Sequence, residues 1–151
     1  MHEMYESARS FLESALTCRL EQDRLIERIA HLHDRCTKIT PTLSQVPGGG
    51  SSDAQAQWAA LADEQRRLTE KLKEELERAR EIEAFIDRLP TELYRQILKH
   101  RYIDYRTIPA IRAALEHSGY SRSQRHVERL LGRALMEAER EWVNMKGDCT
   151  T

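Results

Sequence analysis

A sustained heptad spacing of apolar residues constrains this chain more than any other feature. From residue 4 to residue 39, the positions at alternating steps of four and three are Met4, Ala8, Phe11, Ala15, Cys18, Gln22, Leu25, Ile29, Leu32, Cys36 and Ile39. From residue 54 to residue 89, the same steps fall on Ala54, Trp58, Leu61, Gln65, Leu68, Leu72, Glu75, Ala79, Ile82, Ile86 and Leu89. Such a repeat predicts two long helices with left-handed coiled-coil packing.

The two heptad segments are separated by a stretch rich in helix-breaking residues. Residues 1–40 and 51–89 contain neither glycine nor proline, whereas the stretch between them holds Pro41, Pro47, Gly48, Gly49 and Gly50. This composition predicts a loop over about residues 40–53. Ser52 and Asp53 are candidates for the N-cap of the second helix.

Because the two apolar seams are equally long, an antiparallel hairpin over residues 1–89 is predicted. Residues whose numbers add up to about 93 or 94 then face each other, which places Leu25 beside Leu68 and Phe11 beside Ile82. Gln22 and Glu75 are polar seam positions that weaken packing but help to fix the register. The alternative is that the seams pair between two chains and form a homodimer.

The composition agrees with an all-α fold and indicates in which cellular compartment the protein is expected. The chain has 151 residues, with 24 basic and 25 acidic side chains but only six glycines and four prolines. This pattern is typical of helices with charged outer faces. The three cysteines form no CxxC pair, no apolar run approaches the length of about 18 residues that spans a bilayer, and the first residues do not resemble a secretory signal. A cytoplasmic protein without membrane contact is expected.

Residues 90–146 have the pattern of a small helix-turn-helix module. Thr91 follows the break at Pro90, and a turn over residues 117–120 precedes Ser121, the expected cap of a last helix running to about Trp142. Two helices joined by a short turn that contains glycine, with a third helix before them, form this motif. The tail from Gly147 to Thr151 is expected to fray.

Pro109 fixes the start of the helix before the turn. Proline is tolerated in the first turn of a helix but not in its interior. The helix containing Pro109 is therefore predicted to begin near Thr107.

The last helix has one apolar and one basic face. With about 100° per residue, Leu131, Ala134 and Ala138 lie within about 40° of Val127. Together with Leu130, about 60° away, they predict the buried face. On the opposite side, between about 160° and 240° from Val127, lie four basic residues. They are Arg122, Arg125, Arg129 and Arg133. A basic helix face that serves only solubility usually has acidic residues between the basic ones, and this face has none. A polyanionic partner is therefore favoured over a role in solubility alone.

Charge is also segregated along the chain. Residues 1–89 hold 13 basic and 17 acidic side chains, a net charge of −4. Residues 90–151 hold 11 basic and 8 acidic side chains, a net charge of +3. The positive charge is therefore confined to the segment with helix-turn-helix spacing, where it suits contacts with phosphate groups and with guanine edges.

Several short motifs in this segment resemble a known family. They are Leu89-Pro90, Ile97-Leu98, Arg101-Tyr102-Ile103, Ile108 with Ile111, Leu115, Gly119-Tyr120-Ser121 and Arg133-Ala134-Leu135. Together they resemble the region-four helix-turn-helix of bacterial sigma factors. With a helical hairpin before it, the whole chain is similar to small phage and prophage proteins, the late transcriptional regulators of the RinA and ArpU type.

The resemblance implies a sequence-specific, DNA-binding transcriptional regulator that reads duplex DNA with the basic helix 121–142. The implied DNA contacts are Arg122, Ser123, Gln124, Arg125, Arg129 and Arg133, with Arg133 toward phosphate. Sigma activity itself is not implied, since the regions that melt promoters are absent. The alternative is an adaptor, docking on RNA polymerase or serving as a small DNA-packaging subunit, with mainly nonspecific DNA affinity.

No catalytic, cofactor or metal site is predicted. His33 and Cys36 are three residues apart, but no second pair of ligands accompanies them. The three consecutive glycines lack the lysine that a phosphate-binding loop requires. Trp58 and Trp142 are interpreted as packing residues, and an enzyme is not expected.

Overall fold

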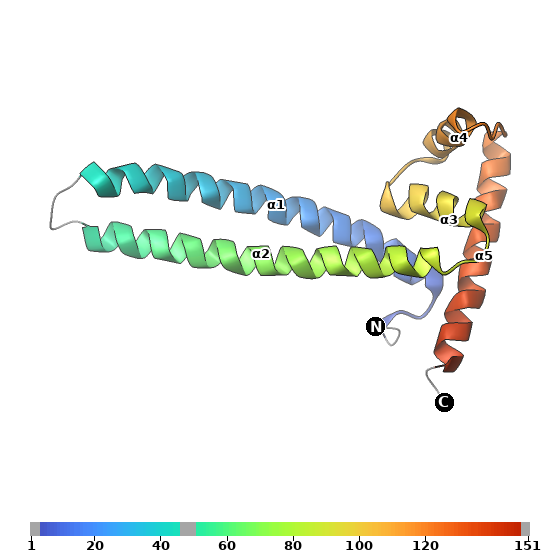
Figure 1. The fold of residues 1–151 in the computed structure, drawn as a ribbon, viewed down its shortest axis with the longest axis horizontal. Coiled ribbons are helices and arrows are strands. Elements are labelled where there is room, and N and C mark those ends of the chain that lie inside the picture. Colours follow the sequence, from blue (N-terminus) through green and yellow to red (C-terminus); the bar gives the residue numbers. More distant parts are fainter. Residues whose placement is uncertain (1–3, 46–50, 149–151) are drawn as a thin grey trace. The chain divides into compact units, whose positions relative to one another are not determined.

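The protein is all-α, as predicted. The computed structural model describes residues 4–45 and 51–148, without the side chains of residues 39–45, 51 and 52. Within these ranges every regular element is a helix (Figure 1): α1 (Ala8–Gln45), α2 (Ser51–Asp87), α3 (Glu92–Leu98), η2 (Lys99–Ile103), α4 (Ile108–His117) and α5 (Gln124–Asp148). The chain divides into two compact units, one of residues 1–18 with 78–151 and the other of residues 19–77.

The unit of residues 19–77 is built from facing parts of α1 and α2, which run side by side in opposite directions (Figure 1). Leu25, Leu32 and Leu68 form its buried core, so the predicted pairing of Leu25 with Leu68 agrees with the structure. The buried side chain of Gln22 donates a hydrogen bond from Nε2 to the carbonyl oxygen of Glu75, at 3.2 Å. A polar seam residue is thus satisfied by the backbone of the opposite helix.

Both helices extend into the segment predicted to be a loop. The sequence predicts a loop over residues 40–53, but α1 continues to Gln45 and α2 starts at Ser51. Pro41 therefore lies inside α1, although a proline in a helix interior removes one backbone hydrogen bond and is unfavourable there. Asp53 lies in the first turn of α2, where a carboxylate favours the helix dipole, and residues 46–50 are outside the described residues.

Trp58 does not pack as expected. Although it occupies a seam position, its side chain is 43% exposed. Its neighbours on α2 are small and polar, and only the half-buried Leu61 among the nearby seam residues joins the core of this unit. A heptad position therefore does not guarantee burial.

Distant segments of the chain contribute to the larger core of the other unit. Its buried residues are Ala8, Phe11, Leu12, Ala15, Cys18, Ile82, Phe85, Ile86, Leu89, Leu98, Ala134, Ala138 and Trp142. The rings of Phe11 and Phe85 contact Trp142 with centroid distances of 5.1 and 5.6 Å. The first residues of α1 and the last residues of α2 thus share a core with α5, which differs from the expected domain boundary at residue 90.

We expect an isolated fragment of residues 90–151 to lose cooperative folding. Its largest buried side chain, Trp142, packs on Phe11 and Phe85, which the fragment lacks. Exposing this apolar surface costs about 25 cal/mol per Å². A thermal melt followed by circular dichroism tests this, and a fragment that unfolds as cooperatively and at the same temperature as the whole chain would contradict the shared core.

Helices α3, α4 and the first half of α5 enclose a second, smaller core. It consists of Ile97, Ile111, Leu115, Val127 and Leu130. Helix α4 is capped by Thr107, whose hydroxyl oxygen accepts a hydrogen bond from the Ala110 amide at 3.4 Å, and Pro109 lies in its first turn. The predicted start near Thr107 is confirmed.

A turn with unusual backbone geometry connects α3 to α4. Lys99–Ile103 is a π-helical turn, and the Asp104 amide donates to the Lys99 carbonyl at 2.9 Å. Tyr105 then adopts a positive φ of 55°, a conformation that costs energy in a residue with a β-carbon. Its hydroxyl donates a hydrogen bond to the carbonyl of Ala15, so this residue connects the turn to α1.

Thr91 and the C-terminal end of α5 both differ in detail from expectation. Thr91 occupies the N-cap of α3, but its hydroxyl bonds to a carboxylate oxygen of Glu137 at 2.7 Å rather than to the helix amides. Helix α5 continues past Trp142 to Asp148, because Met145 still packs against the core of this unit. Gly147 is therefore helical, and residues 149–151 lie outside the described residues.

Candidate nucleic-acid interface

The start of α5 is fixed by a serine cap. The Ser123 hydroxyl oxygen accepts a hydrogen bond from the His126 amide at 3.2 Å, and the Ser123 carbonyl accepts from the Val127 amide at 3.1 Å. The sequence predicts the cap at Ser121, which instead lies in the connection after the turn. Both serines carry the right chemistry, and the position of the turn decides between them.

The turn before α5 ends α4 through a glycine. Gly119 has a φ of +89°, a conformation that only glycine adopts at little cost. The Tyr120 amide donates to the Leu115 carbonyl at 2.8 Å, and the Gly119 amide donates to that of Glu116 at 3.0 Å. These bonds satisfy the last carbonyls of α4 and set the direction in which the chain enters α5.

Because one face of α5 packs against the core, the opposite face is exposed to solvent. Val127, Leu130, Ala134 and Ala138 are buried, as predicted from the helical period, and Leu131 is half-buried. All six residues expected to contact DNA are exposed. Three of the four predicted arginines, Arg125, Arg129 and Arg133, share the exposed face of α5; we call these three the arginine stripe.

Arg122 lies outside the helix and has local partners. Its guanidinium carbon is 4.6 Å from the centre of the Tyr120 ring, and its Nη1 donates to the Ser121 carbonyl at 2.8 Å. Stacking of this kind is favourable between a guanidinium and an aromatic face. The contact holds the Arg122 charge beside the start of α5, next to Gln124.

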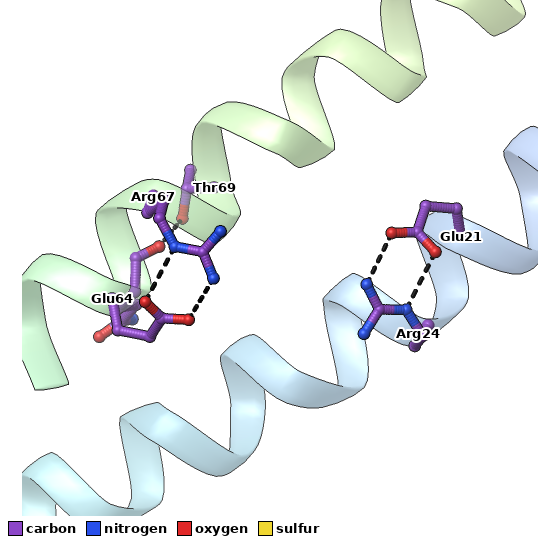
Figure 2. A network of polar contacts seen from close by, with 6 residues as sticks. Glu21, Arg24, Glu64, Arg67 and Thr69 are labelled. Atoms are coloured by element: carbon purple, nitrogen blue, oxygen red, sulfur yellow. Dashed lines mark hydrogen bonds and ion pairs between the residues drawn. The ribbon is translucent and has the colours of Figure 1, made fainter.

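The hairpin arginines show how this chain neutralises a positive charge. Arg24 makes two hydrogen bonds to Glu21, at 2.7 and 2.9 Å, and Arg67 bonds Glu64 in the same two-point manner (Figure 2). These hydrogen bonds hold the pKa of both glutamates below the usual value. Each pair joins residues three apart on one helix, a favourable spacing.

The arginine stripe lacks such partners. In the described residues, none of the ion pairs involves Arg125, Arg129 or Arg133. The nearby acid Glu137 is turned away toward Thr91, while Glu128 is exposed on the flank. Three cations on one helix face therefore repel each other without compensation from a carboxylate.

Charge alone does not reveal the whole of this face. Stepping by about 100° per residue places Gly132, Met136, Arg140 and Val143 on the same side as the stripe. All four are exposed, with Met136 at 59% and Val143 at 63%. The sequence prediction did not include these four residues, although the angular step that locates the arginines also places them on this face.

A cavity in the same unit was also not anticipated. It has a volume of about 580 Å³ and is lined by Arg9, Glu13, Leu16, Arg101, Tyr102, Tyr105, Leu131 and Leu135. Arg9 and Glu13 form an ion pair at 2.9 Å on its wall. Burial raises the pKa of Tyr102 above the usual value.

No family model, curated protein or solved structure matches the chain. In the part of the chain that the structure describes, no cluster contains three or more potential metal ligands. Among the described helices, none combines the length and apolar character needed to cross a bilayer. Function is therefore inferred from the residues of the chain itself.

Proposed function

We propose that the protein is a sequence-specific transcriptional regulator that binds duplex DNA. Helices α4 and α5 would act as a helix-turn-helix, with α5 as the recognition helix, in a protein of phage or prophage origin. The observation that carries the proposal is the arginine stripe, because three exposed cations without acidic partners are most simply explained by an anionic ligand. Duplex DNA presents phosphates along the length of such a helix.

The proposed contacts divide by position along α5. Gln124 and Arg125 lie in the first turn, where side chains of a recognition helix reach base edges in the major groove. Glutamine suits adenine and arginine suits guanine, since each forms two hydrogen bonds with its base. Arg129 and Arg133 follow at one-turn spacing and suit phosphate oxygens.

Residues around the turn would support this contact. Ser123 caps α5 and is exposed, so its position at the N-terminal end of the helix suits a phosphate as well. Arg122 is held beside the Tyr120 ring and adds a fourth positive charge near the start of the helix. In this arrangement, a rigid helix start would present four polar side chains to one groove.

An adaptor function is the second candidate, and exposed apolar side chains on the hairpin favour it. In the unit of residues 19–77, Leu20 is 62% exposed, Ile26 53%, Trp58 43% and Leu76 40%. Large apolar residues at a surface often mark protein contacts, and tryptophan is frequent among the residues that dominate binding. The hairpin would then dock on a partner such as RNA polymerase or a packaging complex.

Selection of bound duplexes from a randomised DNA library separates the two functions. A regulator is expected to enrich one short motif, and the enriched duplex should bind at least about 1,000-fold more tightly than unrelated DNA. Uniform recovery of all sequences would contradict sequence-specific regulation and favour the adaptor. Replacing Trp58 with alanine serves as a matched control, since a change on the hairpin should leave the enriched motif unchanged.

A further inference from the structure

Gly132 lies in the interior of α5, at a position where no contact within the chain requires a glycine. It lies between Gln124 and Asp148 and is exposed. A β-carbon at this position would meet no heavy atom within 4 Å. Because glycine is less favourable than alanine inside a helix, this residue weakens α5 and relieves no crowding in return.

The glycine lies beside the arginine stripe. With about 100° per residue, it is about 20° around the helix from Arg125 and about 60° from Arg129. Arg133 follows directly in sequence, about 100° further around the helix, and the exposed Glu128 lies about 40° from the glycine on its other side. The point where the helix backbone carries no side chain therefore lies at the edge of the stripe. Neither Arg129 nor Arg133 has an ion-pair partner among the residues that the structure describes.

We propose that the sugar-phosphate backbone of duplex DNA approaches the main chain of α5 at Gly132 more closely than a β-carbon would permit. This inference rests on the proposed DNA-binding function and adds a contact point that carries no charge. Glycine is the usual residue where a backbone must come close to a ligand. Closer approach would let Arg129 and Arg133 reach phosphates on either side of that point.

A kink offers the other common reason for a glycine inside a helix, but α5 is continuous from Gln124 to Asp148. Close packing within the fold is a third reason, and the open space around Gly132 argues against it. What remains is a close contact with a molecule outside the chain. The three arginines on one side of Gly132 favour a polyanion as that molecule over an apolar helix.

The test compares two glycine-to-alanine variants of the whole protein. Gly132→Ala is expected to raise the midpoint of thermal unfolding by about 2–4 °C. The same variant is expected to bind a duplex of the selected sequence about five- to tenfold more weakly, since the new methyl group holds the duplex away. Gly132→Leu should weaken binding further, because the obstruction is larger.

Gly147→Ala is the matched control. Gly147 is also helical and exposed with open space around it, but it lies 15 residues beyond Gly132, which is about 22 Å along the helix axis. Its replacement should leave the affinity for the duplex unchanged. A similar loss in both variants would overturn the proposal, because it would reflect a general property of α5.

The outcomes also separate this inference from the proposed function. If the wild-type protein binds the duplex and Gly132→Ala binds equally well, close approach at Gly132 is refuted while DNA binding stands. If the wild-type protein binds no duplex at all, the proposed function itself fails. If Gly132→Ala instead changes only self-association or binding of a protein, a protein occupant replaces DNA and the inference is overturned.

Discussion

Replacing both Arg125 and Arg129 with alanine is expected to weaken binding to duplex DNA about 100-fold. The two guanidiniums lie on the exposed face of α5 and have no acidic partners among the described residues, so the double substitution affects the interface with the ligand and breaks no ion pair in the protein. The plot of log affinity against log salt concentration should also become shallower by about 0.9 for each phosphate that the variant no longer neutralises. Fluorescence anisotropy over a series of salt concentrations measures both quantities, and circular dichroism should report normal helicity.

A control variant removes the same charge elsewhere. Arg24→Ala with Arg67→Ala changes two arginines that are paired with Glu21 and Glu64 on the hairpin. This variant should retain the affinity and the salt slope of the wild-type protein. Equal effects of both double variants would mean that only the total charge matters, and the assignment of the interface to α5 would be wrong.

Replacing Trp142 with alanine is expected to lower the free energy of unfolding by about 3–5 kcal/mol. The side chain is 2% exposed and contacts the rings of Phe11 and Phe85, so it connects α5 to both α1 and α2. The cavity left by an indole ring is too large for these neighbours to fill. Since small domains are stable by only about 5–15 kcal/mol, urea unfolding should show a large shift of the midpoint.

Trp58→Ala provides the matched comparison for this effect. The substitution is chemically identical, but the Trp58 side chain is 43% exposed on the hairpin. Its replacement should cost about 1 kcal/mol or less, because much of the ring already contacts water. If the two variants were equally destabilised, the shared core of α1, α2 and α5 would not be the main support of this unit.

The heptad spacing predicted the hairpin core well but could not predict what else the helices contact. Leu25 and Leu68 are buried together as expected. Leu12 and Phe85 lie off the seam and are also buried, in the core that α1 and α2 share with α5. A periodic pattern reports that a helix has an apolar face, but contacts between segments far apart in sequence depend on the tertiary fold.

At the candidate interface, the helical period identified the exposed arginines and the buried face around Val127. It placed the cap at Ser121, whereas the structure has Ser123, because both serines fit the chemistry. The separate position of Arg122 depends on the same choice, because the helix begins only at Gln124. Local hydrogen bonds in the turn decide these details, and they follow from the backbone path after Gly119.

The salt dependence of wild-type binding tests the central claim most directly. A fluorescent duplex carrying the selected motif is titrated with the intact protein between about 50 and 200 mM salt, the range over which phosphate contacts are most sensitive. If Arg122, Arg129 and Arg133 each contact a phosphate, log affinity should fall linearly with log salt with a slope of about −2.7. A protein that binds no duplex at the lowest salt concentration, or whose affinity does not change with salt, would contradict a DNA interface on α5.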